Sequence, residues 1–355
     1  MNKNEVLVIG LMSGTSLDGV DLVYVKFVKN NYREFEILNC ETISYSDNWK
    51  SVLQQAIYFE QGDLDRLNVK YGVLLSKLIN NFIDKFQIEN IDFVASHGHT
   101  VLHQPEKGIT LQIGDGQTIA NLINQKVVCD FRTQDVKLGG QGAPLVPIGD
   151  ELLFSEFDYC LNLGGFANIS YQKGGERIAF DICPVNIVLN KYALKLGVEY
   201  DDKGKIASSG KLLGGLLNEL NDISFYKKWS PKSLGLEWVE KEIFPLLESK
   251  KNSVKDVLRT FVEHISIQIV GQISKGSKVL VTGGGVYNDY LISKLVERSS
   301  VVFVFPDKKI IEFKEALIFA FLGVLRFDNQ VNCMKSVTGA IKDHSSGEIF
   351  YPLSK

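Results

Sequence analysis

The chain has 355 residues, of which 23% are charged, and a formal net charge of −3 at pH 7. This length predicts two domains, each large enough to bury a core of its own. Because the charges are spread along the chain, there is no electrostatic footprint for nucleic acid or an anionic membrane, and we expect a small-molecule partner.

The sequence gives no sign of a membrane span or of stabilising cross-links. No apolar run approaches the length that crosses a bilayer, and the opening MNKNEVLVIG lacks the layout of a signal peptide, so a cytoplasmic location is expected. The cysteines are odd in number and far apart, with no CxxC pair, which argues against a disulfide framework or a zinc site. We expect buried, reduced thiols at Cys40, Cys129, Cys160, Cys183 and Cys333.

Strand and helix signals alternate in the first part of the chain, which predicts an α/β fold. Residues 5–12 and 20–28 read as two strands joined by the polar turn 13–19, a β-hairpin. Apolar residues recur at helical spacing from Asp63 to Phe86. The segment 91–100, IDFVASHGHT, reads as a strand that ends in a polar, glycine-containing loop.

The second part repeats this arrangement. Residues 157–163, the turn GGFAN and the strand 176–182 predict a second set of hairpins, and residues 277–295 predict a strand, three glycines and a helix. The helix 315–327 is expected to return the chain to a hinge within 132–145. Two similar halves predict the duplicated ribonuclease-H-like fold of actin-like ATPases, two domains around a central cleft, with one domain at 1–140 plus 328–355 and the other at 141–327.

The turn MSGTSLDG, residues 12–19, is a candidate phosphate loop because two glycines and three hydroxyl residues follow a strand. A plain hairpin turn has the same composition, and for this segment alone the two interpretations are equal. Gly164 and Gly165 occupy the equivalent turn of the second half, and two facing turns would clamp a polyphosphate. Asp18 and Asp21 are candidates to hold Mg²⁺ through water, although for Asp21 we favour an exposed turn carboxylate.

Asp181, at the end of IAFD, is the candidate catalytic base, because a carboxylate beside a glycine turn can reach a cleft. An Asx turn into a helix that has Pro184 in its first turn is an equally good interpretation. Gly283, Gly284 and Gly285 could admit an adenosine or form a tight strand-to-helix connection. The chain contains neither GxGxxG nor GxxxxGK[ST], which excludes a dinucleotide fingerprint and a P-loop.

Several further polar residues are candidates for substrate contacts. His97, His99 and His103 lack the additional ligands of a metal site, so we expect one of them to bind a sugar hydroxyl or to orient a neighbour. Arg132 could fork onto a carboxylate or phosphate, or form a hinge salt bridge. Glu315 begins the last predicted helix, where the helix dipole alone would favour an acid.

Long strings along the chain carry a family resemblance. GLMSGTSLDGVD, SHGHTVLHQP, LQIGDGQTIA, DFRTQDVKLGGQGAPLVP, LNLGGFANIS, PKSLG, VTGGGVYN, EALIFAFLG and SVTGA occur in this order. Over nearly its whole length the chain resembles the anhydro-N-acetylmuramic acid kinases. The resemblance implies a dimeric enzyme of peptidoglycan recycling that uses ATP, Mg²⁺ and water to convert 1,6-anhydro-N-acetylmuramic acid into N-acetylmuramic acid 6-phosphate.

The resemblance also implies roles for particular residues. Asp181 becomes the base that activates the water. Phosphates are assigned to Gly14, Thr15, Ser16, Asp18 and Gly19 with Gly164, Gly165 and Asn168; adenosine to Gly283, Gly284 and Gly285; and the sugar to His97, Thr100, Arg132 and Glu315.

Two positions depart from the family pattern. Where the family has DTGPGN, this chain has DICPVN: Ile182 replaces a threonine, and Cys183 and Val185 replace glycines that let the backbone approach a ligand closely. His99 replaces the glutamine of SHGQT. Two other functions therefore stay open: a divergent sugar kinase acting on another amino or anhydro sugar, and a non-catalytic nucleotide or sugar sensor.

Overall fold

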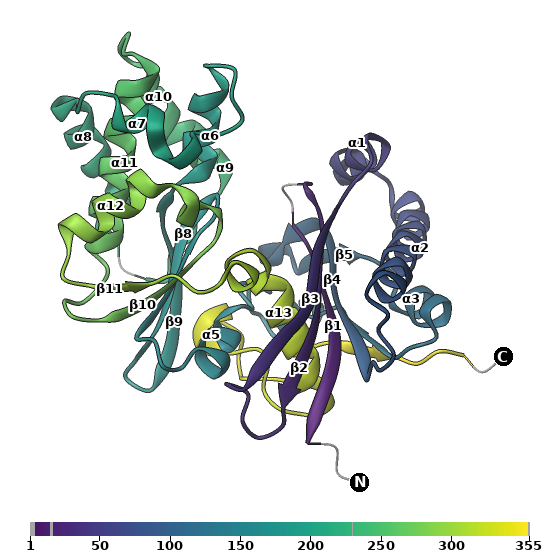
Figure 1. Ribbon diagram of the computed structural model, residues 1–355. Coiled ribbons are helices and arrows are strands. Elements are labelled where there is room, and N and C mark those ends of the chain that lie inside the picture. Colours follow the sequence, from purple (N-terminus) through teal and green to yellow (C-terminus); the bar gives the residue numbers. More distant parts are fainter. Residues whose placement is uncertain (1–3, 15–16, 229, 354–355) are drawn as a thin grey trace. The chain divides into compact units, whose positions relative to one another are not determined.

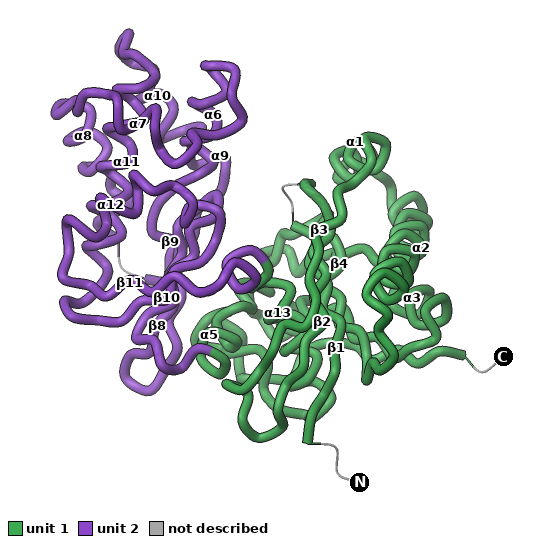
Figure 2. The backbone as a smooth tube through the Cα atoms, in the orientation of Figure 1, with its two compact units in different colours: residues 1–153, 313–355 green, residues 154–312 purple. Residues whose placement is uncertain are grey.

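The computed structural model describes residues 4–14, 17–228 and 230–353, and the chain forms two compact units (Figure 1 and Figure 2). Unit 1 contains residues 1–153 and 313–355, and unit 2 contains residues 154–312. These boundaries differ from the predicted 140/141 and 327/328. The reason is that helix α5 packs on helix α13 inside unit 1, where a Cβ at Gly149 would lie 2.6 Å from the Ile318 side chain.

The described part of unit 1 contains a seven-stranded sheet in the order β12-β6-β4-β1-β2-β3, with β5 beside β4. The predicted hairpin is confirmed, since β1 and β2 pair antiparallel, and β3 continues the meander. β4 is parallel to β1 and β6, and β12 in the tail pairs antiparallel with β6. The strands are β1 (Glu5–Ser13), β2 (Gly19–Val28), β3 (Phe35–Ser44), β4 (Phe93–Gln104), β5 (Ile109–Ile113), β6 (Val127–Cys129) and β12 (Glu348–Phe350).

Helices cover both faces of this sheet (Figure 1). The predicted helix at 63–86 is confirmed as α2, whose buried residues join Ile9 and Leu11 of β1 in one core. On the opposite face Gly10 admits α13, because a Cβ there would lie 2.4 Å from the Ala316 carbonyl oxygen. The helices are α1 (Asp47–Gln55), η1 (Ala56–Tyr58), α2 (Gln61–Phe86), η2 (Pro105–Lys107), α3 (Gly116–Ile123), α4 (Thr133–Lys137), α5 (Pro147–Leu153), α13 (Lys308–Phe327, shared with unit 2) and α14 (Lys335–Thr338).

Two details of unit 1 differ from the sequence-based expectations. SHGHT is no terminal loop: β4 continues to Gln104 because β5 pairs with its second half, and a register shift against β1 lies between Leu11 and Ser13. The last long helix begins at Lys308, so Glu315 lies well inside it rather than at its start.

Unit 2 repeats the strand order of unit 1. Its described strands form a five-stranded sheet in the order β11-β10-β7-β8-β9, in which β7, β8 and β9 make an antiparallel meander and β10 and β11 run parallel to β7. The series β3-β2-β1-β4-β6 of unit 1 matches it strand for strand, which confirms the duplicated ribonuclease-H-like fold. The strands are β7 (Tyr159–Leu163), β8 (Phe166–Lys173), β9 (Glu176–Pro184), β10 (Lys278–Thr282) and β11 (Val302–Val304).

The helices of unit 2 enclose a separate apolar core around α11, whose residues Phe261 and Ile265 are fully buried. None of the described helices combines the length and the apolar character that a membrane span requires. The helices are α6 (Asn186–Leu194), η3 (Asp202–Gly204), α7 (Lys205–Ser208), α8 (Gly214–Asn221), η4 (Ser224–Lys227), α9 (Leu236–Trp238), η5 (Val239–Ile243, a π-helix), α10 (Phe244–Glu248), α11 (Val254–Val270), η6 (Gly284–Tyr287) and α12 (Asp289–Arg298).

Candidate functional site

The turn between β1 and β2 is anchored by a buried hydroxyl network. Ser13 Oγ lies 2.6 Å from Tyr45 Oη and 3.2 Å from His99 Nδ1, and it accepts a 2.9 Å hydrogen bond from Tyr71 Oη. The hydroxyls of Tyr45 and Tyr71 also form a hydrogen bond with each other. A serine hydroxyl offers one donor and two acceptor positions. These partners use all three, so Ser13 fixes the start of the turn and does not bind a ligand.

This network is uncharged at neutral pH. Burial raises the pKa of Tyr45 and, further, that of Tyr71, and it lowers the pKa of His99 to about 4. The departure from the family's glutamine at position 99 therefore exchanges one neutral hydrogen-bonding group for another. The network itself therefore adds no positive charge that would attract a phosphate to this turn.

The predicted phosphate-binding residues of this turn are only partly described. Thr15 and Ser16 lie outside the described residues, Gly14 is half-buried, and Asp18 is exposed. At Gly19 a Cβ would lie 2.4 Å from a carbonyl oxygen of β3. Packing of β2 against β3 thus accounts for the glycine at position 19.

Asp21 is a strand residue and not the exposed turn carboxylate that we favoured. It pairs with Met12 inside the hairpin, is half-buried, and accepts a 2.6 Å hydrogen bond from Thr42 Oγ1 on β3. Its negative charge raises the pKa of Glu315. The two carboxylates therefore share one electrostatic environment, which depends on a strand register that sequence reasoning could not supply.

His97 orients Arg132. His97 Nδ1 lies 2.9 Å from the Gly98 carbonyl oxygen, which only accepts, so this nitrogen carries the ring proton. His97 Nε2 then accepts a 2.9 Å hydrogen bond from Arg132 Nε, while Arg132 Nη1 donates to the Gly142 carbonyl oxygen at 2.6 Å. Burial and then the Arg132 charge hold the pKa of His97 well below its usual range, which keeps the ring neutral.

Arg132 and Glu315 influence each other electrostatically within unit 1. Burial lowers the pKa of Arg132 to about 10, with the charge of Glu315 acting against it, so the guanidinium stays protonated at neutral pH. Glu315 keeps a solvent-exposed surface, yet the surrounding protein raises its pKa, and Arg132 opposes that rise. Its position inside α13 removes the helix-dipole explanation. Next to it, Lys314 makes a buried 2.6 Å ion pair with Asp150.

The remaining sugar-site candidate in unit 1 is Thr100, on β4. Its hydroxyl accepts a 3.3 Å hydrogen bond from Gln112 Nε2 on β5. Unit 1 therefore brings together Asp21, Arg132 and Glu315, which are electrostatically coupled. His97 accepts a hydrogen bond from Arg132.

Asp181 lies in unit 2, at a bulge of strand β9. Asn168 of β8 pairs with Asp181, and the next pair is Ala167 with Cys183, so Ile182 has no partner across the ladder. Such bulges re-aim side chains and are frequent beside active sites. The strand continues to Pro184, which overturns the expectation of a strand-end Asp and of an Asx turn with Pro184 in the following helix.

The PKSLG segment holds the Asp181 carboxylate. Asp181 Oδ2 accepts a 2.8 Å hydrogen bond from the Leu234 N–H, and the Asp181 N–H donates to the Lys232 carbonyl oxygen at 3.1 Å. Burial raises the pKa of Asp181, and the Leu234 hydrogen bond acts in the opposite direction. In the sequence, PKSLG carries only part of the family resemblance, whereas the structure shows that this segment positions Asp181.

The DICPVN departure is a packing feature. Ile182, Cys183 and Val185 are almost fully buried and belong to the apolar core of unit 2. The backbone of Val185 has a negative φ of −129°, and its N–H donates to the Gly165 carbonyl oxygen at 2.8 Å. The segment after Asp181 thus ties β9 to the GGFAN turn and leaves no backbone donor at Val185 for a ligand.

Two glycine turns meet at the carboxyl ends of the parallel strands β7 and β10. Gly283 has a φ of +86°, and a Cβ there would lie 2.4 Å from Asn162 Oδ1, so the position requires glycine. Gly165 and Gly284 are exposed, whereas Gly285 is buried against Leu163. Carboxyl ends of parallel strands are the usual place for ligands in open α/β sheets.

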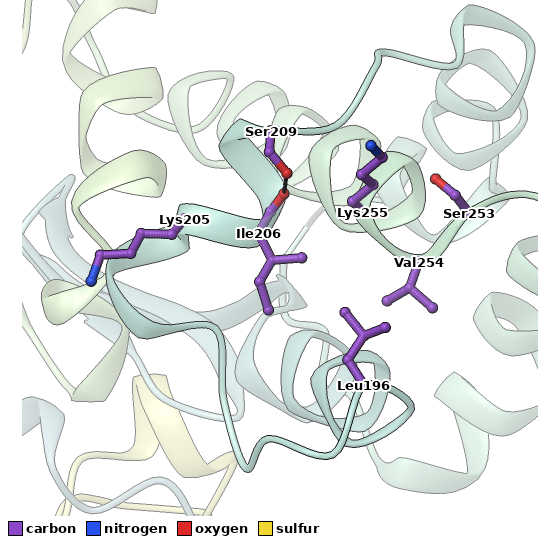
Figure 3. A pocket seen from close by; sticks show the side chains of 7 residues that line it. All are labelled: Leu196, Lys205, Ile206, Ser209, Ser253, Val254 and Lys255. Atoms are coloured by element: carbon purple, nitrogen blue, oxygen red, sulfur yellow. Dashed lines mark hydrogen bonds between the residues drawn. The ribbon is translucent and has the colours of Figure 1, made fainter.

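A shallow hollow elsewhere in unit 2 is apolar and distant in sequence from these turns (Figure 3). None of the predicted site residues lines it, so it is not a candidate for the same chemistry. It is formed by Leu196, Lys205, Ile206, Ser209, Ser253, Val254 and Lys255.

Comparisons with known proteins show the family of this chain. Residues 6–352 match the family model described as anhydro-N-acetylmuramic acid kinase. Curated relatives with that name include one from Bacillus thuringiensis subsp. konkukian, 32% identical over 97% of this chain and 99% of its own length, and one from Shewanella baltica, 33% identical over 96% and 98%.

Among solved structures, component A of (R)-2-hydroxyglutaryl-CoA dehydratase from Acidaminococcus fermentans aligns with 89% of this chain and 96% of its own, at 12% identity and a TM-score of 0.46. The family assignment rests on the sequence matches, which span almost the whole of both partners. The chain belongs to the anhydro-N-acetylmuramic acid kinase family.

Proposed function

We propose that the chain uses ATP and water to convert 1,6-anhydro-N-acetylmuramic acid into N-acetylmuramic acid 6-phosphate and ADP. A base takes a proton from water, whose oxygen attacks the anomeric carbon. The bond from that carbon to O6 breaks, and O6 attacks the γ-phosphorus while the bond to the β-phosphate oxygen breaks. The products retain the atoms of the water and of the transferred phosphoryl group, and one proton is released.

Asp181 is the proposed base, and its setting is the observation that carries the proposal. The Leu234 N–H fixes one carboxylate oxygen at 2.8 Å, and the bulge at Ile182 sets the direction of the side chain. Burial raises the pKa of Asp181, which makes its ionised form a better proton acceptor. General-base assistance of this kind contributes about 10²–10⁴-fold in rate.

The glycine turns are proposed to bind the nucleotide. In unit 2, Gly164, Gly165 and Asn168 would contact the phosphates, and the exposed backbone at Gly284 would face the adenosine. In unit 1, the β1–β2 turn is a separate candidate for phosphate contacts. Mg²⁺ usually takes one or two carboxylates along with nucleotide phosphates, and the exposed Asp18 fits that requirement. When bound, the ion would neutralise charge on the phosphates.

The charged residues of unit 1 are proposed to bind the sugar. Arg132 is held from two sides, by His97 and by the Gly142 carbonyl, so its guanidinium is ordered before a ligand arrives. Ordering of this kind lowers the entropy cost of binding. Arg132, Glu315, His97 and Thr100 would position the acceptor, and most of the rate enhancement would come from such positioning.

Mass analysis of the product tests the reaction. The purified protein is incubated with ATP, Mg²⁺ and the anhydro sugar, and the expected product is heavier than the sugar by one phosphoryl group and one water. Addition of phosphate alone would mean ordinary kinase chemistry. Asp181→Asn is expected to lose turnover while nucleotide affinity, measured by calorimetry, stays within a few-fold; full activity in this variant would remove Asp181 from the base role.

A second candidate is a kinase for another amino or anhydro sugar. The observation that favours it is the burial of Ile182, Cys183 and Val185, which replaces a glycine loop by core packing beside Asp181. A panel of acceptors with coupled detection of ADP separates the two candidates. ATP binding without turnover on every acceptor would instead support a sensor.

Assembly and location complete the proposal. We place the enzyme in the cytosol, in peptidoglycan recycling, and as a homodimer. Sedimentation equilibrium checks the last point, since a dimer has twice the chain's 39.7 kDa.

A further inference from the structure

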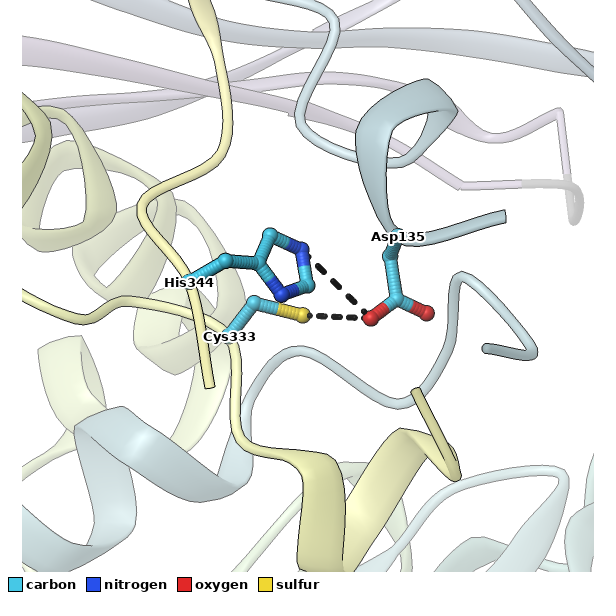
Figure 4. A group of neighbouring side chains, drawn as sticks. All are labelled: Asp135, Cys333 and His344. Atoms are coloured by element: carbon cyan, nitrogen blue, oxygen red, sulfur yellow. Dashed lines mark hydrogen bonds and ion pairs between the residues drawn. The ribbon is translucent and has the colours of Figure 1, made fainter. Parts of the chain in front are cut away.

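A second group of chemically reactive side chains lies in unit 1, near Arg132 but with none of the proposed sugar-binding residues among its members. Asp135 of α4 meets Cys333 and His344 of the tail, and one ligand atom from each lies within 4.8 Å of the others (Figure 4). All three side chains are buried, and Asp135 has no exposed surface at all. A carboxylate, a thiol and an imidazole together are a ligand set that zinc uses in proteins.

The spacing of these atoms suits a tetrahedral ion. Asp135 Oδ1 accepts a 3.0 Å hydrogen bond from Cys333 Sγ and lies 3.5 Å from His344 Nε2. Zinc bonds of about 2.0–2.3 Å place ligand atoms roughly 3.3–3.5 Å apart in a tetrahedron. The histidine is already at that separation, and the thiol sulfur has to move by about 0.5 Å.

The orientation of His344 is the second, independent observation. Its Nδ1 lies 3.2 Å from the Lys342 carbonyl oxygen, which can only accept, so Nδ1 carries the ring proton. Its Nε2 is buried and makes no hydrogen bond to any described residue. In the neutral ring, this lone pair faces the Asp135 carboxylate, and the two electron-rich atoms repel. A cation between them removes the repulsion.

From this geometry we propose that Asp135, Cys333 and His344 bind one Zn²⁺. The Lys342 carbonyl is the backbone acceptor that commonly orients a metal-binding histidine. A water would fill the fourth position, while Thr338 Oγ1 donates a 2.7 Å hydrogen bond to Asp135 Oδ1. The thiolate and imidazole select Zn²⁺ over Mg²⁺, and binding releases the Cys333 thiol proton to solvent.

The site would brace the part of unit 1 that holds Arg132. Asp135 Oδ2 accepts a 2.6 Å hydrogen bond from the Gly142 N–H, and the Gly142 carbonyl accepts from Arg132. Cys333 and His344 are themselves joined by a β-bridge. One ion would therefore clamp the tail, α4 and the loop behind Arg132 together, as a structural site and independently of the proposed reaction.

The test measures zinc directly on the tag-free chain. The protein is stripped with a chelator and titrated with Zn²⁺ in competition with a chromophoric chelator, with excess Mg²⁺ and no nucleotide. One ion per chain is expected, with affinity at least tenfold lower in Cys333→Ser and in His344→Gln. Cys40→Ser and His103→Gln are the matched controls and should bind like the parent chain.

A Co²⁺ spectrum of the parent chain keeps the proposal testable even where a variant misfolds. A thiolate charge-transfer band with the d–d bands of tetrahedral Co²⁺ is expected, and loss of the charge-transfer band in Cys333→Ser supports it. Absence of stoichiometric binding, an octahedral spectrum, or parent-like affinity in both ligand variants would overturn the site. If NMR shows that His344 is protonated at neutral pH in the presence of Zn²⁺, a proton and not a metal ion lies between His344 and Asp135, and the proposal is wrong.

Discussion

His99 gives a quantitative prediction, because it is a buried histidine at a position where the family has glutamine. It is 3% exposed and lies against Ser13 and Tyr71 in the uncharged network below the β1–β2 turn. Folding therefore disfavours its protonated form. His99→Gln keeps a neutral hydrogen-bonding side chain and removes the proton-binding group.

The size of the effect follows from linkage. Burial lowers the pKa of His99 from 6.5 to about 4, so the unfolded chain binds a proton that the folded chain refuses. Stability rises with pH across this window and is lost as the pH falls below about 6.5. At about 1.4 kcal/mol per tenfold change, the full loss is about 3 kcal/mol, of which about 2 kcal/mol falls between pH 7 and pH 5.

Urea unfolding at pH 7 and pH 5 measures this loss in unit 1. Trp49 packs edge-on against Tyr71 and reports on this region, with Trp229 and Trp238 replaced by phenylalanine. From pH 7 to pH 5, the parent chain should lose about 2 kcal/mol more free energy of unfolding than His99→Gln. His103→Gln, which changes an exposed histidine whose pKa is lowered less than that of His99, should keep more of the parent's loss than His99→Gln does. Equal losses in the parent chain and His99→Gln would refute the reasoning.

Three other predictions follow from single contacts. The acid limb of kcat/KM should lie above the ordinary Asp range, because burial raises the pKa of Asp181 and the ionised form is required; a pH–rate profile checks it. Gly283→Ala should destabilise unit 2 by about 1–3 kcal/mol, from a positive φ and a Cβ 2.4 Å from Asn162 Oδ1, which a thermal melt measures. Lys314→Met should cost about 3–5 kcal/mol in urea unfolding, because it removes the counter-ion of the buried Asp150, whereas the double variant with Asp150→Leu should recover part of that loss.

Local patterns were sufficient for most of the fold. Alternation over residues 5–12 and 20–28 predicted the first hairpin, and helical spacing predicted α2, because each pattern records one buried face of one element. Recurrence of the strand-turn-strand pattern predicted the duplication. These features depend on residues that are close in sequence.

Long-range pairing decided the rest, and it carries no local signal. SHGHT becomes part of β4 only because β5 pairs with it, and Asp181 is turned by a bulge opposite Asn168 of a neighbouring strand. The expectation that Asp21 is an exposed turn residue was wrong for the same reason, because its hydrogen-bond partner Thr42 lies on β3. Asp135 and Cys333 are 198 residues apart, so counting cysteine pairs could not find their contact.

Buried histidines that stay neutral cannot cause a pH dependence of activity near neutral pH. Burial lowers the pKa of His97 and His99 in unit 1, and that of His264 in unit 2 to about 3, so these rings do not titrate near neutrality. Among the residues assigned to the reaction, a loss of activity on acidification then belongs to a carboxylate. Desolvation by the surrounding protein raises the pKa of both carboxylates. The charge of Arg132 opposes this rise at Glu315, whereas at Asp181 the neutral Leu234 N–H opposes it. The limb should therefore persist in His99→Gln and in Glu315→Gln, if Asp181 carries the proton.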